Sequence, residues 1–136
     1  MNMKKTLSVF LIISVFLTSM LCGCGKAPVS LDGITLSPIG EGEKSFNLTV
    51  TDSEGETVGY AISTNAETVG DALFELELID GEPGPYGLYV KTVLGKTLDF
   101  NTHGKYWAFY IDGVYATSGI DKTEIENGVH YALKAE

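Results

Sequence analysis

Apolar residues alternate along most of the chain after residue 45, and only one stretch repeats them at helical spacing. That stretch, residues 69–79, follows two alternating runs at 46–51 and 57–64. The apolar stripe consists of Val69, Ala72, Leu73, Leu76 and Ile79. Residue 68 is a threonine, a residue type preferred at helix N-caps, and three residues later Asp71 resembles the acidic member of a capping box. The pattern therefore predicts a hairpin followed by one helix.

Extended runs dominate the sequence after this helix. "LYVKTVL", "KYWAFYI" and "VHYALKA" read as strands, and the Asp112-Gly113 pair between the second run and "VYATSG" is typical of a tight turn. Residues 80–87, "DGEPGPYG", predict a stiff loop that carries Tyr86. Residues 120–128 predict a helical turn or a loop. Two strands, one helix and further strands predict an α+β domain with a β-grasp-like mixed sheet and a single packed helix.

The N-terminus reads as a targeting segment. Two lysines precede the uncharged run "TLSVFLIISVFLTSML", the pattern of a secretory signal. The following Leu21-Cys22-Gly23-Cys24 resembles the lipobox of bacterial lipoproteins, which implies cleavage before Cys24 and lipidation of its thiol. We expect residues 1–23 to be a lipoprotein signal peptide, residues 24–44 a lipidated tether that could include a short strand, and residues 45–136 the folded domain. A disulfide or metal pair formed by the two cysteines is the alternative.

Charge excludes nucleic acid as a partner. The nine basic residues are all lysines, against 18 acidic residues, and loss of the two signal lysines leaves a net charge of −11. Binding to phosphates needs clustered Lys or Arg. An acidic surface also opposes adhesion to anionic headgroups, so the lipid would attach the protein to the membrane. We expect a protein anchored at the extracytoplasmic face of the cell membrane.

The run Gly104–Tyr115, "GKYWAFYIDGVY", departs from the pattern of a strand with one wet face. Trp107, Phe109 and Ile111 alternate with Tyr106, Ala108 and Tyr110, so that both faces carry large apolar side chains. We expect the Trp107 side to pack on the helix, and the tyrosine side to remain as a candidate binding surface.

Several short motifs together resemble the transcobalamin-like C-terminal domain, found in bacterial surface lipoproteins and as the β domain of animal cobalamin carriers. They are "TVGDAL", "YGLYVKTVLG", "GKYWAFYIDGVYATSGID" and "IENGVHYAL", within residues 46–133. Trp107, Tyr110, Gly113, Gly119 and the segment 128–131 match the family's pattern. The resemblance implies a β-grasp-like domain that binds a small soluble ligand. Since the animal carriers hold cobalamin between this domain and a helical domain, it also implies a helical carrier domain or a transporter as partner.

The candidate ligand-binding residues are aromatic. They are Tyr106, Trp107, Tyr110, Tyr131 and Tyr86. A tyrosine offers a flat apolar face and a hydroxyl, which suits stacking on a planar ligand with polar edges. Core packing is the alternative for Trp107, and cross-strand pairing is the alternative for the strand tyrosines. Tyr89 could extend the surface from the loop after the helix.

Motifs of catalysis do not occur in the sequence. It has no G-x-S-x-G, H-E-x-x-H or phosphate-loop pattern, and its two histidines, His103 and His130, stand apart. The acidic run "DSEGE", residues 52–56, lacks the spacing of an EF-hand loop, so we expect an acidic turn. We expect no enzyme activity, no metal site and no required cofactor.

These observations favour a membrane-anchored surface lipoprotein that binds a small ligand for capture or uptake, with cobalamin or another corrinoid as the candidate. The alternative is a non-enzymatic module that binds a protein or polymer at the cell envelope.

Overall fold

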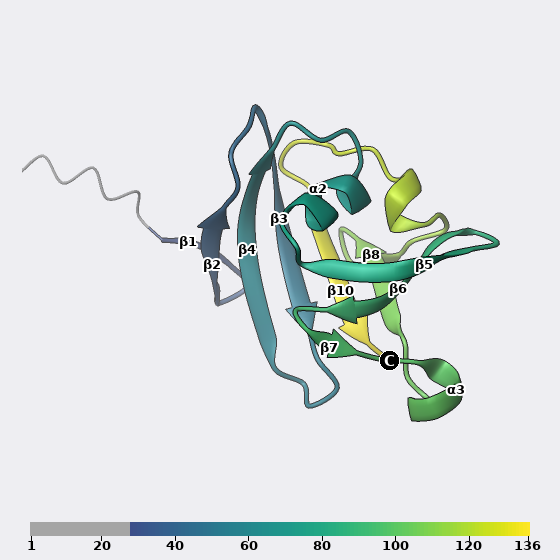
Figure 1. Cartoon of the computed structure of the whole chain (residues 1–136). Coiled ribbons are helices and arrows are strands. Elements are labelled where there is room, and N and C mark those ends of the chain that lie inside the picture. The colour runs from purple at the N-terminus through teal and green to yellow at the C-terminus, as the bar shows by residue number, and fades with distance from the viewer. Residues whose placement is uncertain (1–27) are drawn as a thin grey trace, which may run out of the picture.

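The computed structural model describes residues 28–136 (Figure 1). The predicted signal peptide and Cys24 lie outside the described residues. Ten strands, two short α-helices and one 3-10 turn make up the described chain. The elements are β1 (Val29–Leu31), β2 (Ile34–Ile39), β3 (Lys44–Thr51), β4 (Thr57–Thr64), α2 (Val69–Glu75), β5 (Ile79–Gly84), β6 (Gly87–Val93), β7 (Lys96–Thr97), α3 (Phe100–His103), β8 (Trp107–Ile111), β9 (Val114–Tyr115), η1 (Ile120–Lys122) and β10 (His130–Ala135).

Seven strands form one mixed, open sheet in the order β1-β2-β4-β3-β10-β8-β9. The last strand, β10, lies between β3 and β8 and runs parallel to β3 and antiparallel to β8. The four central strands β4-β3-β10-β8 thus have the β-grasp arrangement. In it, the strand that comes first in the sequence, β3, and the strand that comes last, β10, are parallel neighbours. The predicted α+β class and mixed sheet with one main helix are confirmed.

A second, three-stranded sheet, β5-β6-β7, lies with α2 over one face of the large sheet (Figure 1). The buried core joins all three parts: Phe46 and Leu133 from the large sheet, Leu73 from α2, and Ile79 and Val93 from the small sheet. One core therefore holds the helix and both sheets together.

Among residues 28–136, no helix has the length and apolarity needed to cross a membrane.

The large sheet begins inside the stretch that the sequence assigned to the tether. β1 and β2 pair with each other, and β2 runs parallel to β4. Leu36 of β2 lies opposite Gly59 of β4 and is 2% exposed, because the missing side chain of the glycine leaves room for the leucine. Because residues 24–44 are rich in Gly, Pro and Ser, the sequence did not predict that β1 and β2 pair there.

Helix α2 starts where the sequence predicted and ends earlier than the stripe suggested. The hydroxyl of Thr68 accepts a hydrogen bond from the amide of Asp71 at 3.1 Å, the expected N-cap. After Glu75 the chain turns through Glu77, whose φ is +56°, and Ile79 already begins β5. Ile79 contributes to the core from a strand, although its spacing also fits the helical stripe.

The segment predicted as a stiff loop forms the β5–β6 hairpin. Pro83 pairs with Leu88 across it, and a bulge lies between Asp80 and Gly81. A proline removes a ladder hydrogen bond and is tolerated because β5 is an edge strand of the small sheet. The hairpin tip projects beyond the large sheet (Figure 1).

Candidate functional site

An open groove of about 520 Å³ lies between the β5–β6 hairpin and β8, and we call it the aromatic groove. Its floor comes from Tyr106, Trp107 and Phe109, at the start of β8 and within it. The hairpin residues 84–90 form one wall, and residues 115–120, which run from β9 into η1, form the other. The hairpin thus meets two later segments, residues 106–109 and 115–120, at this groove.

The side chains of the aromatic groove are mostly apolar, and none is charged. Its aromatic members are Tyr86, Tyr89, Tyr106, Trp107, Phe109 and Tyr115. Polar groups come from tyrosine hydroxyls, from Thr117 and Ser118, and from the loop backbones. A groove of this kind suits a neutral ligand with an apolar face and hydrogen-bonding edges, since a charged ligand would find no counter-charge on the lining.

Two tyrosine hydroxyls of the groove are linked. A hydrogen bond with Tyr115 is the largest cause that raises the pKa of Tyr106 to about 12, with partial burial as the second cause. The ring of Tyr115 also meets Tyr110 edge-on, with the ring centroids 5.5 Å apart. Tyr106 therefore stays protonated at neutral pH and offers a hydroxyl, rather than a phenolate, to the groove.

Trp107 is fixed in the floor of the groove. Its indole N–H donates a hydrogen bond to the backbone carbonyl of Lys96 at 3.2 Å, and only 6% of the residue is exposed. Most of its ring belongs to the core, where its hydrogen bond joins it to β7 of the small sheet, whereas the sequence predicted packing of this side of β8 on the helix. Trp107 contributes shape to the groove, and the exposed tyrosines contribute most of its accessible aromatic surface.

Three of the predicted ligand residues, Tyr86, Tyr106 and Trp107, come together in this groove. Tyr110 does not line it: its hydroxyl hydrogen-bonds the carboxylate of Glu136, and the ammonium of Lys134 lies 4.6 Å from the centre of its ring. Tyr110 reaches the groove only through its contact with Tyr115.

Tyr131 lies in the core and is 1% exposed. Its ring meets Phe46 edge-on at 5.3 Å and stacks on Phe109 at 5.9 Å. Its hydroxyl accepts a hydrogen bond from the amide of Glu126. Core packing accounts for all of these contacts, so Tyr131 supports the groove floor from below.

The second face of β8 carries buried short side chains beside Tyr110, which lies on the same face and contacts Lys134. Ala108 is 1% exposed, and its neighbours on this face across the sheet, Ala132 and Thr49, are 3% and 5% exposed. The hydroxyl of Thr49 hydrogen-bonds the ring of His130 at 2.7 Å. The open aromatic surface lies instead at the edge of the sheet, where Tyr106 and Tyr115 meet.

Tyr115 and residues 116–120 were missed by the sequence reasoning. Tyr115 pairs with Tyr110 across the two-residue Asp112-Gly113 turn, so the turn register could have placed the two tyrosines together. Nothing local in residues 116–120 indicated that they form a wall, because their place depends on contacts with the distant hairpin.

A second cavity of about 520 Å³ lies beside β1 and β2. Its lining is mostly short side chains of Ser, Thr, Pro and Val, with Phe46 as its aromatic member. Since Phe46 is 2% exposed, this cavity offers a ligand little aromatic surface. The aromatic groove is therefore the better candidate site.

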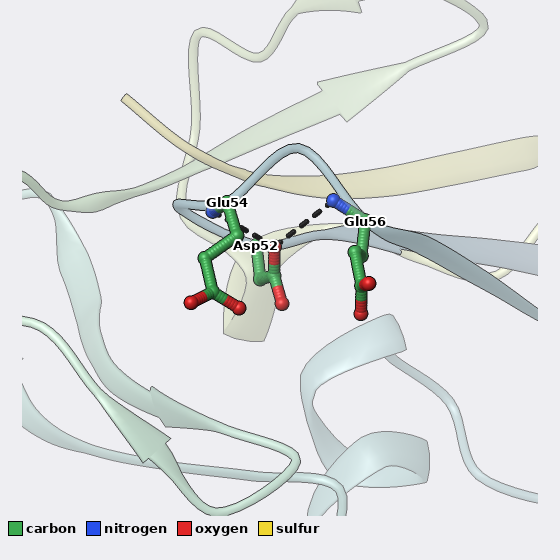
Figure 2. A group of neighbouring side chains, drawn as sticks. All are labelled: Asp52, Glu54 and Glu56. Carbon is green, nitrogen blue, oxygen red and sulfur yellow. Dashed lines mark hydrogen bonds between the residues drawn. The ribbon is translucent and has the colours of Figure 1, made fainter.

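The acidic turn after β3 gathers three carboxylates, Asp52, Glu54 and Glu56, whose oxygens lie within 4.8 Å of one another (Figure 2). Asp52 accepts hydrogen bonds from the amides of Glu54 and Glu56 at 2.9 and 3.0 Å, and it forms an ion pair with Lys96 of β7. The Lys96 hydrogen bond is the largest cause that lowers the pKa of Asp52. The Asp52 carboxylate thus has a structural role in closing the turn and tying it to the small sheet.

Comparison with protein families finds one match: the family model described as Domain of unknown function (DUF4430) matches residues 66–130. This range runs from just before α2 to the start of β10 and includes every residue of the aromatic groove. No curated protein matches the chain.

Seventeen chains of solved structures match this one, among them the two that follow. A candidate metal-binding protein from Ruminococcus gnavus is 28% identical with a TM-score of 0.65, over 69% of this chain and 97% of that protein. Haptocorrin in complex with Cbi is 18% identical with a TM-score of 0.57, over 68% of this chain. The chain matches 25% of the length of haptocorrin, and at this identity the likeness shows the fold alone.

Proposed function

We propose that the chain binds a small neutral molecule in the aromatic groove, with cobalamin or another corrinoid as the candidate ligand. The groove itself carries the proposal: it is uncharged, lined by six aromatic residues and large enough for part of a planar ligand. The solved haptocorrin structure, whose fold resembles this one, is a complex with Cbi, which supports a corrinoid as the first ligand to test. We propose binding without catalysis.

The test is calorimetric titration of the full chain, in a mild detergent, with cobalamin. We expect saturable binding that weakens about three- to tenfold in Tyr86→Ala, since an aromatic contact contributes about 0.5–1.5 kcal/mol. Phe74→Ala is the matched control, because Phe74 is an exposed aromatic residue on α2 outside the groove. Absence of binding at millimolar cobalamin to the folded protein would exclude cobalamin, and equal loss in both variants would exclude the groove.

We further propose that the protein is a lipoprotein, anchored at the extracytoplasmic face of the membrane through Cys24, where it captures its ligand for an uptake system. The lipobox-like residues 21–24 support this proposal. Cys24→Ser should abolish labelling by a radioactive fatty acid and leave the precursor uncleaved, whereas Cys22→Ser should be labelled normally. Labelling of the Cys24→Ser variant would contradict the assignment.

A second candidate function is docking of a protein or polymer onto the groove rim. The observation that favours it is the exposure of Tyr86, Val114 and Tyr115, at 88%, 69% and 52%. Apolar side chains exposed beside an open groove are typical of interaction sites. Such a partner could be a helical carrier domain or a transporter component that closes the groove over the ligand. Cobalamin affinity that rises only when a purified candidate partner is added would favour this function.

A further inference from the structure

We propose that Asp121 is a positioning residue: its carboxylate holds the β5–β6 hairpin against η1 and so sets the width of the aromatic groove. The backbone amide of Leu88, on the hairpin, donates a hydrogen bond to Oδ1 of Asp121 at 2.8 Å. These residues are 33 positions apart in sequence: Leu88 lines the hairpin wall, and Asp121 directly follows Ile120, the last residue of the other wall. Within residues 28–136, it is the one hydrogen bond between the hairpin tip and residues 115–122.

Two glycines leave the space that this carboxylate fills. A Cβ added at Gly87 would come within 2.6 Å of Oδ1 of Asp121, and one added at Gly119 within 2.7 Å of the same oxygen. Gly87 also has a φ of +116°, which side chains with a Cβ rarely adopt. The two walls can approach closely only because both positions lack a side chain, and the Asp121 oxygen bridges them there.

The Asp121 side of the contact is firmly held. Ile120, its neighbour in η1, is 2% exposed in the core. The carbonyl of Thr123 accepts a hydrogen bond from the amide of Val69 at the start of α2, and the hydroxyl of Thr123 donates to the carbonyl of Gly119. The turn that carries Asp121 is thus fixed to the helix.

The hairpin side is held mainly at its base. Val90 and Val93 anchor β6 in the core, and the amide of Leu94 donates to the carbonyl of Leu78. Tyr86, at the tip, is 88% exposed. A two-stranded ribbon fixed at its base can swing at its tip, so the Leu88–Asp121 bond controls how far the hairpin wall stands from the other wall.

The test compares Asp121→Ala with Asp121→Asn in the full chain. The asparagine keeps a side-chain oxygen that can accept from the Leu88 amide, whereas the alanine has no acceptor. We expect hydrogen exchange of the Leu88 amide to be about tenfold faster or more in Asp121→Ala and close to the original rate in Asp121→Asn. The amide of Leu133, in the core of β10, is the internal reference.

The width of the groove has its own readout in Trp107, the single tryptophan of the chain. Acrylamide should quench its fluorescence about twofold more strongly in Asp121→Ala than in the original protein. In Asp121→Asn the quenching should equal that of the original protein. Unchanged Leu88 exchange or unchanged quenching in Asp121→Ala would overturn the proposal, as would equal effects of the two substitutions. If Asp121→Ala does not fold, the test is made by NMR in the unaltered protein. A scalar coupling between the Leu88 amide nitrogen and the Asp121 carboxyl carbon is expected there, and its absence would overturn the proposal.

The consequence for ligand binding rests on the proposed function. With cobalamin as the probe, Asp121→Ala should bind about tenfold more weakly and Asp121→Asn nearly as tightly as the original protein. If the original protein does not bind cobalamin, the proposed function fails for that ligand, while Leu88 exchange and Trp107 quenching still test the role of Asp121. If it binds and Asp121→Ala binds equally well, Asp121 does not position the groove.

Discussion

Two tyrosine hydroxyls of the groove come from Tyr106, the residue just before β8, and from Tyr115 of β9. Tyr106 and Tyr115 come from opposite ends of the β8–β9 segment, and both line the groove. The hydrogen bond with Tyr115 is the largest cause that raises the pKa of Tyr106 and burial is the second, so both disfavour the Tyr106 phenolate. The pair therefore extends the pH range over which the groove presents a Tyr106 hydroxyl.

Tyr115→Phe should lower the pKa of Tyr106 from about 12 toward the ordinary tyrosine value of 10.0. The reason is that the hydrogen bond with Tyr115 is the largest cause of the upward shift. The measurement is a pH titration followed by NMR of tyrosines labelled at the ring carbon that bears the hydroxyl. Tyr86→Phe, which removes a hydroxyl from the exposed hairpin tip, is the control and should leave the Tyr106 titration unchanged.

The same shift predicts how stability depends on alkaline pH. The folded protein keeps the Tyr106 proton up to about pH 12, whereas the unfolded chain releases it near pH 10. Between these values the unfolded state binds fewer protons, so the free energy of unfolding should fall as pH rises through this window. Urea unfolding at pH 9 and pH 11 measures the fall, and the fall should be smaller in Tyr115→Phe.

The lowered pKa of Asp52 predicts how stability depends on acidic pH. Its pKa is lowered mainly by the hydrogen bond from Lys96, so its stabilising contribution should be present above about pH 4 and lost as pH falls below that value. Asp52→Asn keeps an oxygen for the turn amides but loses the ion pair, and should have a lower Tm than the original protein at pH 7. Asp52→Ala, which loses both, should have the lowest Tm. Equal Tm values for the two variants would show that the turn hydrogen bonds contribute nothing.

At the scale of elements, α2 depends on its first turn because it is only seven residues long. An isolated helix of this length is unstable in water, so its cap and its buried face must hold it. Thr68→Ala removes the acceptor for the Asp71 amide and should lower the free energy of unfolding by about 1 kcal/mol. Urea denaturation measures the change, and Thr68→Ser, which keeps the hydroxyl, should lie near the original value.

The sequence predicted the elements that have a local signature. The helix start at Thr68, the strand around Trp107 and the Asp112-Gly113 turn each depend on residues within a few positions of one another. The β5–β6 hairpin was not predicted, because its glycines and prolines favour a loop. Only the edge position of β5 makes Pro83 compatible with a strand.

The candidate site was predictable in part for the same reason. Aromatic residues such as Tyr86, Tyr106 and Trp107 could be identified as unusual by type and pattern. Their convergence, and the burial of Tyr131, depend on which strand lies beside which. Asp121 had no local signal at all, because its partner Leu88 is 33 residues away.

At the scale of the whole molecule, the two sheets and α2 share a single core. The aromatic groove lies between the β5–β6 hairpin of the small sheet and the β8–β9 edge of the large sheet. The groove floor is therefore also core: Trp107 and Phe109 pack inward against the same cluster that α2 covers. The floor of the groove cannot loosen without loosening the core beneath it, so the floor should be lost only when the whole domain unfolds, whereas the position of the hairpin wall depends on the Leu88–Asp121 bond.

This coupling predicts one cooperative transition for the described domain. Leu73→Ala, in α2 and fully buried, should lower the free energy of unfolding by about 2–5 kcal/mol. Phe74→Ala, at the next position and 40% exposed, should lower it by roughly 1 kcal/mol or less. Urea unfolding is followed by Trp107 fluorescence, which reports the groove floor, and by far-UV circular dichroism, which reports the strands. The two signals should give the same midpoint in every variant, because the groove and the sheets unfold together. A Trp107 transition at lower urea than the dichroism transition would show that the groove region unfolds as a separate unit.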